Sequence, residues 1–151
     1  MNRTLHVLVQ ADSKDEAIEE ADEFLERLSQ EDSVDGWESS EFKAMRLHSK
    51  RAQEELSEAF AAVREDFMHH IEIVRHKLND WTDEQLWNRE DRFKLGQVAE
   101  LEMDYYAECL HCSRVHTHCI VDTDFNWPRP KDLKEYYTEK DWWLVLAPVH
   151  Y

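Results

Sequence analysis

Thiol and imidazole side chains are concentrated in one short run of the chain, Cys109-Leu-His-Cys112-Ser-Arg-Val-His116-Thr-His118-Cys119. Thiolates and imidazoles are the usual protein ligands of zinc, and a Cys-x-x-Cys pair can hold one ion from a single turn of chain. His116 and His118 lie on the same face of an expected strand, because side chains two residues apart share a face. The run therefore predicts a zinc site formed by Cys109, Cys112, His116 and His118.

A second interpretation places the two cysteines of the Cys-x-x-Cys pair in a hydrophobic core. Cys109 and Cys112 continue the apolar stripe of a helix expected over residues 93–112, and a free cysteine packs as a small apolar residue. Only three residues separate Cys112 from His116, and no second Cys-x-x-Cys follows, which departs from zinc-finger spacing. The Cys-x-x-Cys motif lies at the end of the expected helix and not at its N-terminus, where a thioredoxin-like redox motif would lie, so a redox role is disfavoured. The zinc interpretation and the interpretation without a cofactor both remain open.

A second group of polar residues, Asp122-Thr-Asp124-Phe-Asn126, follows an apolar strand expected over residues 113–124. The spacing resembles the start of an EF-hand loop, but position six is Trp127 where the loop needs glycine, and position twelve is Leu133. An aspartyl-phosphate mechanism would need more α/β sheet than the 27 residues after Asp124 supply. We interpret these carboxylates as solvated loop residues.

Three histidines, His69, His70 and His76, lie in a charged helical segment and are interpreted as surface residues. The sequence has no Ser-His-Asp order, no glycine-rich phosphate loop and no His-Glu-x-x-His motif. We therefore assign no catalytic residue, and an enzyme is the less favoured class.

The first elements of the chain have clear local signals. Alternating apolar residues around Leu5–Val9 predict a strand. Ser13 and Glu16 form a capping box, and the following 3.6-residue periodicity predicts a helix over Lys14–Ser29. Gly36-Trp37 suggests a short extended piece before the next element.

The middle of the chain reads as a long helical segment over residues 41–90. From Glu41 to Trp81 no glycine or proline occurs, and apolar residues recur every three or four positions. We expect Ser39 or Ser40 to cap this helix and any break to fall in residues 48–51. The stripe from Ala52 onward resembles a heptad seam, which would pack in the core or join a second copy as a homodimer.

The last elements alternate between strand and helix. After the strand over residues 113–124, two prolines predict a loop over residues 126–130, followed by a short helix over Asp132–Tyr137. Trp142–Ala147 is apolar on both faces, as expected for a central strand. We therefore expect one α+β domain over 1–151, with a small mixed or antiparallel sheet in a ferredoxin-like arrangement and a long helical insertion.

Composition limits the class of partner. Of the 151 residues, 34 are Asp or Glu and 18 are Lys or Arg, which gives a formal charge of −16. Such a charge repels nucleic acids and anionic membranes, so we expect neither as a direct partner. Three origins of the acidity stay open: salt adaptation, an acidic mimic of DNA, and an ordinary acidic cytoplasmic protein.

Three clustered cysteines and no 18-residue apolar run indicate an intracellular chain without a membrane span.

The two ends of the chain resemble small uncharacterised proteins encoded by tailed viruses and prophages. The resemblance rests on Leu5–Val9 followed by Asp15-Glu16-Ala17, on Thr117–Asp122 with Trp127, and on the closing Asp141–Tyr151 segment. It covers about a third of the chain, and the long helical middle departs from it. The resemblance implies an accessory viral or haloarchaeal protein and gives no residue a role. We expect the protein in the cytoplasm, which is that of the host cell if it is viral. We therefore expect a non-enzymatic interaction protein, with a zinc-binding protein or a DNA-mimic inhibitor as the alternatives.

Overall fold

The computed structural model of the chain describes residues 2–30, 34–80, 82–84, 118–137 and 141–150. The chain divides into two compact units, residues 1–62 with 116–151, and residues 63–115. Whether both units belong to one domain, as expected over 1–151, stays a prediction. The helix expected over residues 93–112 lies outside the described residues. Within the described ranges, no helix is both long enough and apolar enough to cross a membrane.

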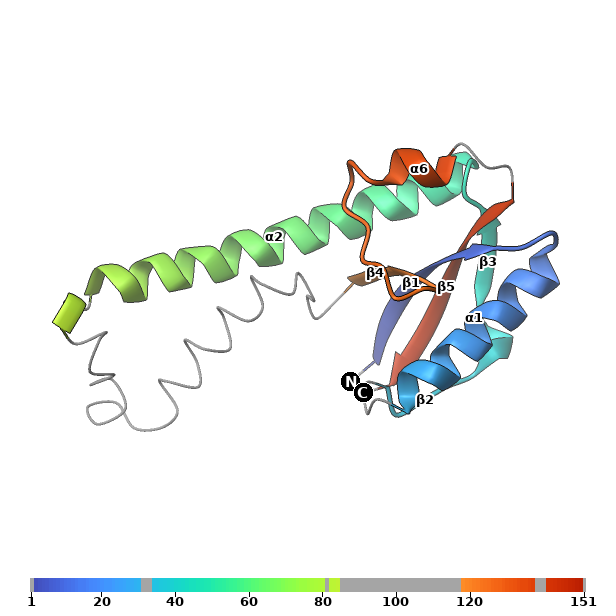
Figure 1. Cartoon of the computed structure of the whole chain (residues 1–151), viewed down its shortest axis with the longest axis horizontal. Coiled ribbons are helices and arrows are strands. Elements are labelled where there is room, and N and C mark those ends of the chain that lie inside the picture. The colour runs from blue at the N-terminus through green and yellow to red at the C-terminus, as the bar shows by residue number, and fades with distance from the viewer. Residues whose placement is uncertain (1, 31–33, 81, 85–117, 138–140, 151) are drawn as a thin grey trace. The chain divides into compact units, whose positions relative to one another are not determined.

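The elements form a mixed α+β fold, which confirms the predicted class (Figure 1). In chain order they are β1 (Asn2–Gln10), α1 (Lys14–Ser29), β2 (Gly36–Trp37), a 3-10 turn (Ser39–Glu41), β3 (Lys43–Arg46), α2 (Lys50–Asp80), β4 (His118–Asp122), α6 (Leu133–Tyr137) and β5 (Trp142–His150).

The sheet is mixed and has the strand order β2-β5-β1-β4, with β3 also pairing with β5. The central strands β1 and β5 are antiparallel, from Asn2 opposite His150 to Gln10 opposite Trp142. β4 pairs with β1 in parallel, so the sheet is mixed as expected. This strand order does not confirm the ferredoxin-like arrangement.

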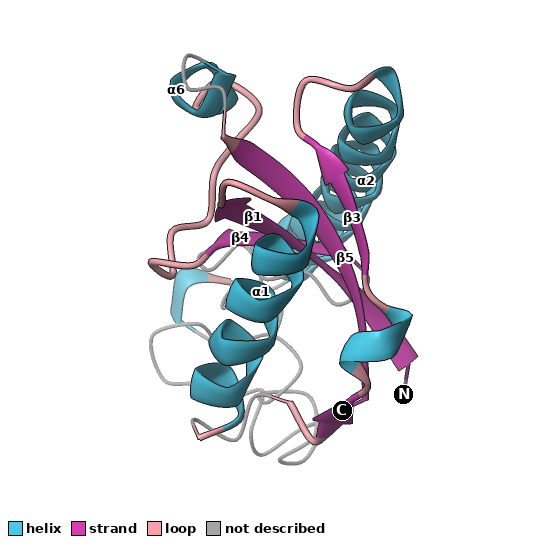
Figure 2. Cartoon of the chain, turned by 90° about the vertical axis from the view of Figure 1, so that its right-hand side faces the viewer, coloured by secondary structure: helices cyan, strands magenta, loops and turns pink. Residues whose placement is uncertain are grey.

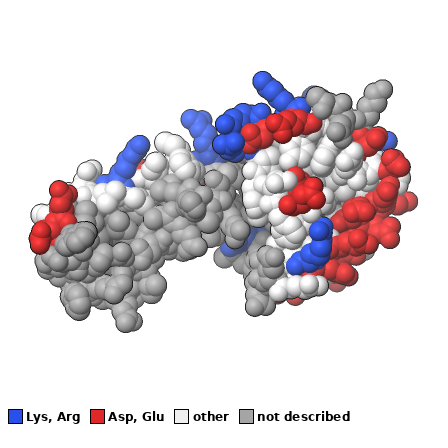
Figure 3. Space-filling view, in the orientation of Figure 1, with Lys and Arg blue, Asp and Glu red and all other residues white. Residues whose placement is uncertain are grey.

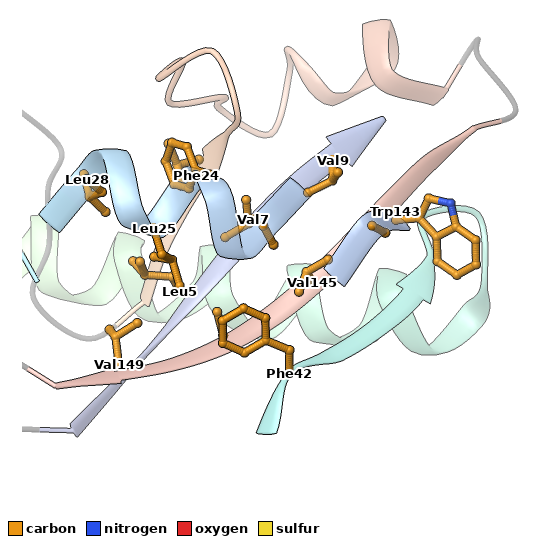
Figure 4. Close-up of a cluster of buried hydrophobic side chains, with 14 of the residues drawn as sticks. Leu5, Val7, Val9, Phe24, Leu25, Leu28, Phe42, Trp143, Val145 and Val149 are labelled. Carbon is orange, nitrogen blue, oxygen red and sulfur yellow. The ribbon is translucent and has the colours of Figure 1, made fainter. Parts of the chain in front are cut away.

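Helix α1 and the start of α2 lie on opposite faces of the sheet (Figure 2). A hydrophobic cluster packs on each of these faces. Cluster 1 packs α1 against one face, where Leu5, Val7 and Val9 of β1 meet Phe24 and neighbouring side chains (Figure 4). Cluster 2 packs the first turns of α2 and the short α6 against the other face. Its buried members are Leu8, Leu47, Ala52, Leu56, Ala59, Ile120, Leu133, Leu144 and Leu146. Alternate residues of β5 belong to alternate clusters, which confirms that this strand is buried on both sides.

Helix α1 begins and ends where its sequence signals predict. The backbone N–H of Glu16 donates to Ser13 Oγ at 3.2 Å, which satisfies one of the unpaired donors of the first turn. The Glu16 carboxylate in turn accepts the N–H of Asp12 at 2.7 Å. The helix buries Ala17, Ala21 and Phe24 on the face that meets the sheet.

The expected start of the long helix at Glu41 is wrong, because residues 43–46 form the strand β3. Ala44 packs against cluster 1 and Met45 against cluster 2, which is the two-residue alternation of a strand and not the period of a helix. The helix α2 begins at Lys50, inside the expected break over residues 48–51. Its first turn is capped by Ser49, whose Oγ accepts the N–H of Ala52 at 3.2 Å, and not by Ser39 or Ser40.

Candidate functional site

The residues predicted to bind zinc lie mostly where the structure gives no description. Cys109, Cys112 and His116 are outside the described residues. His118 is the first residue of β4, and its backbone is in register with Thr4 of β1. The described ranges contain no group of three or more His, Cys, Asp or Glu side chains that could hold a metal ion. The zinc site therefore stays a prediction.

Asp122 is the most enclosed carboxylate of the described chain and the centre of the candidate site. It ends β4, and only 4% of its surface is exposed. The interpretation of this segment as solvated loop carboxylates is wrong for Asp122, although Asp124 is exposed as expected. A buried carboxylate is costly unless hydrogen bonds replace its hydration shell, so its partners decide what it can do.

Four hydrogen bonds converge on the two oxygens of Asp122. Its Oδ1 accepts the backbone N–H groups of Asp124 at 3.0 Å and Asn126 at 2.8 Å. Its Oδ2 accepts the Asn126 side-chain amide at 2.9 Å and the Tyr136 hydroxyl at 2.8 Å. A carboxylate offers about four lone-pair directions, and these donors use all of them. The arrangement suits a structural anchor and leaves no lone pair for an EF-hand ion or for attack on a phosphoryl group.

The loop that follows Asp122 is also fastened to α1. Phe125 has a positive φ of 62°, a conformation that costs energy in a residue with a side chain. Its ring packs against Phe24, with the centroids 5.0 Å apart. The Arg27 guanidinium lies over both rings and donates a hydrogen bond to the Thr123 carbonyl at 3.0 Å. These contacts offset the strain and hold the loop against cluster 1.

Tyr136 is the partner that joins Asp122 to α6. Burial, and then the hydrogen bond to the Asp122 carboxylate, raise the pKa of Tyr136 above its ordinary value of 10.0. The phenol therefore remains a hydrogen-bond donor at neutral pH. Its ring meets the Trp142 ring edge to face, with the centroids 4.8 Å apart. The position of α6 thus depends on the Asp122 side chain, fourteen residues before Tyr136.

The three histidines of α2 do not share one environment. His69 and His76 are exposed as expected, and His76 Nε2 lies 3.3 Å from Asp80 Oδ2. The interpretation of His70 as a surface residue is wrong, because only 7% of it is exposed. The rings of His69 and His70 meet edge to face, with the centroids 5.7 Å apart. Consecutive helix positions point in different directions, which accounts for one neighbour being buried and the other exposed.

Sequence reasoning identified the Asp122 segment but missed its role. The available signal was the turn chemistry of Asp and Asn, whose side chains accept backbone N–H groups two or more residues ahead. The Tyr136 partner had no comparable signal, because it comes from another element.

Comparisons of the chain with protein-family models, with curated proteins and with solved structures gave no match.

The anchor role of Asp122 predicts a large loss of stability in Asp122→Asn. An amide at this position would direct its N–H₂ group toward donors that now bind an oxygen, and lost hydrogen bonds to a charged group cost about 1.5–3 kcal/mol. Urea denaturation at neutral pH should show a loss of about 2–4 kcal/mol. Asp124→Asn, a matched change on the exposed neighbour, should alter stability by less than about 0.5 kcal/mol. Equal effects of the two variants would contradict the anchor role.

The zinc prediction is tested by metal content and by chelation. If Cys109, Cys112, His116 and His118 hold zinc, the reduced protein should contain about one equivalent, and a chelator should lower its melting temperature. Cys112→Ser should abolish the metal and lower the melting temperature in the same way. Metal-free protein whose melting is insensitive to the chelator would instead favour core cysteines, and Cys112→Ala would then cost roughly 1 kcal/mol.

Proposed function

We propose that the protein is a non-enzymatic accessory protein that acts by binding another protein through α2, and that its first partner is a second copy of the chain. The supporting observation is a change in burial along the apolar stripe of this helix. Ala52, Leu56 and Ala59 are buried in cluster 2. Over residues 63–80, no apolar side chain that the structure describes is buried.

Beyond Ala59 the stripe contains large side chains that are not fully buried. Leu78 is 43% exposed, and Val63, Phe67 and Val74 are half-buried. Met68, on the adjoining face of α2, is 49% exposed. Large apolar residues that remain accessible on a helix are a feature of interaction surfaces. The spacing of three and four residues suits the packing of one helix along another.

Association of two copies needs salt. Each copy carries a formal charge of −16, so two copies repel one another at low ionic strength. At about 1 M salt the Debye length falls to about 3 Å, and repulsion between surface carboxylates is largely screened. A salt-adapted virus or cell therefore fits both the acidic composition and the use of an apolar helix face for pairing.

Sedimentation in low and molar KCl tests the pairing. The wild type should be a dimer at micromolar concentration in molar KCl, and Phe67→Glu should be a folded monomer, because a carboxylate in an apolar interface costs several kcal/mol. Ala61→Glu adds the same charge at an exposed position of α2 and should remain a dimer. A wild-type monomer at every salt concentration would contradict the proposal, and unfolding of Phe67→Glu would assign the stripe to the core.

A second candidate function, an acidic mimic of DNA that occupies a basic protein, is favoured by the outer face of α1. Acidic side chains gather over this helix (Figure 3). The helix has two basic residues, Lys14 and Arg27. It has six exposed carboxylates: Asp15, Glu16, Glu19, Glu20, Glu23 and Glu26. A dense row of negative charge attracts a cationic surface in the way that phosphates do.

Neutralising matched sets of carboxylates separates this candidate from a diffusely acidic surface. Glu19→Gln, Glu20→Gln and Glu23→Gln together should weaken binding to immobilised poly-lysine at moderate salt several-fold more than Glu54→Gln, Glu58→Gln and Glu65→Gln together, because the first set lies in the dense row. Both sets remove the same charge. Equal losses would show that net charge alone governs binding, and the mimic would lose its support.

A further inference from the structure

The short helix α6 is the one described helix of the first unit that has little internal stability. It has five residues, and a helix of that length does not persist in water on its own. It lies in the connection from β4 to β5, and it takes part in none of the strand ladders. Its position therefore depends on the side chains that fasten it to the rest of the unit.

Three side chains supply the fastening. Leu133 is buried in cluster 2. The Tyr136 hydroxyl donates to Asp122 Oδ2 at 2.8 Å, and the Tyr137 hydroxyl donates to Gln53 Oε1 at 3.0 Å. Lys134 and Glu135 are exposed. The anchoring groups thus belong to the end of β4 and to the first turn of α2, on the cluster 2 side of the sheet.

The start of α6 is stabilised within its own segment. The backbone N–H and Nε of Arg129 donate to Asp132 Oδ2 at 2.9 and 2.8 Å, and the N–H of Glu135 donates to the Asp132 carbonyl at 3.1 Å. These bonds do not reach the sheet, so they do not fasten the segment to it.

We propose that α6 is a strap that opens as a unit while the sheet remains folded, and that the Tyr136–Asp122 hydrogen bond is its main latch. A short segment outside the strand ladders, held by the side chains of a few residues, opens at a lower free energy than the strands of a core. The Tyr136 bond has a charged acceptor, so it is stronger than the neutral Tyr137–Gln53 bond. Opening removes Leu133 from cluster 2 and uncovers the Trp142 ring, which Tyr136 covers when the strap is closed.

Native-state hydrogen exchange of the full chain, measured by NMR at low guanidinium concentrations, tests the strap. In the wild type, the amides of residues 135–137 should be protected, yet exchange faster than those of β1 and β5, with a rate that low denaturant hardly changes. Tyr136→Phe should speed exchange of residues 135–137 about tenfold, because the lost bond stabilises the closed strap. Amides of β1 and β5 that exchange only by global unfolding should speed by a similar factor, because the bond is also absent in the unfolded chain. Tyr137→Phe should have a smaller effect, about threefold.

Ser13→Ala is the matched control, because it removes the cap of α1 on the other face of the sheet. It should speed exchange of β1 and β5 about fivefold and leave residues 135–137 unaffected. If Ser13→Ala speeds exchange of residues 135–137 by the same factor as that of β1 and β5, α6 opens only with the whole unit and the proposal is wrong. A complete lack of protection at residues 135–137 in the wild type would equally overturn it, because no closed strap would exist.

Discussion

The antiparallel ladder between β1 and β5 joins the two ends of the chain, and the other described elements of the first unit are arranged around it. It runs from Asn2 opposite His150 to Gln10 opposite Trp142, and the two ends of the chain meet there (Figure 1). Each of the other described strands pairs with one member of this ladder. Both faces of the ladder are apolar, so α1 must cover one face and the start of α2 with α6 must cover the other.

This constraint accounts for the placement of the polar groups. The carboxyl end of β4 lies where its chain leaves the sheet, and the buried Asp122 there replaces lost hydration with four hydrogen bonds. Arg27 of α1 reaches the same loop from the cluster 1 side. Asp122 thus connects the end of the sheet to α6 on the cluster 2 side, while Arg27 connects the same loop to α1. The loop is a structural joint between the two hydrophobic clusters.

Local signals predicted the elements that local interactions define. The capping box of Ser13 and Glu16 fixed the start of α1, and the doubly apolar Trp142–Ala147 run identified a central strand. β3 was missed because Phe42 and Met45 fit a helical spacing as well as they fit opposite faces of a strand. The burial of Asp122 was missed because its donor Tyr136 belongs to another element. The burial of His70 was missed because the three histidines were interpreted together, whereas consecutive residues of a helix point in different directions. The predicted zinc ligands and the predicted helix over residues 93–112 stay predictions.

The central claim is that the two ends of the chain form a self-sufficient folding unit around the β1–β5 ladder. The most direct measurement is the urea unfolding of a shortened chain in which a long Gly/Ser linker joins residues 1–62 to residues 116–151. The compact unit contains both clusters, so we predict one cooperative transition and the same β1–β5 cross-strand contacts by NMR as in the full chain. A shortened chain without a cooperative transition, beside a full chain that has one, would contradict the claim and show that residues 63–115 are needed for the fold.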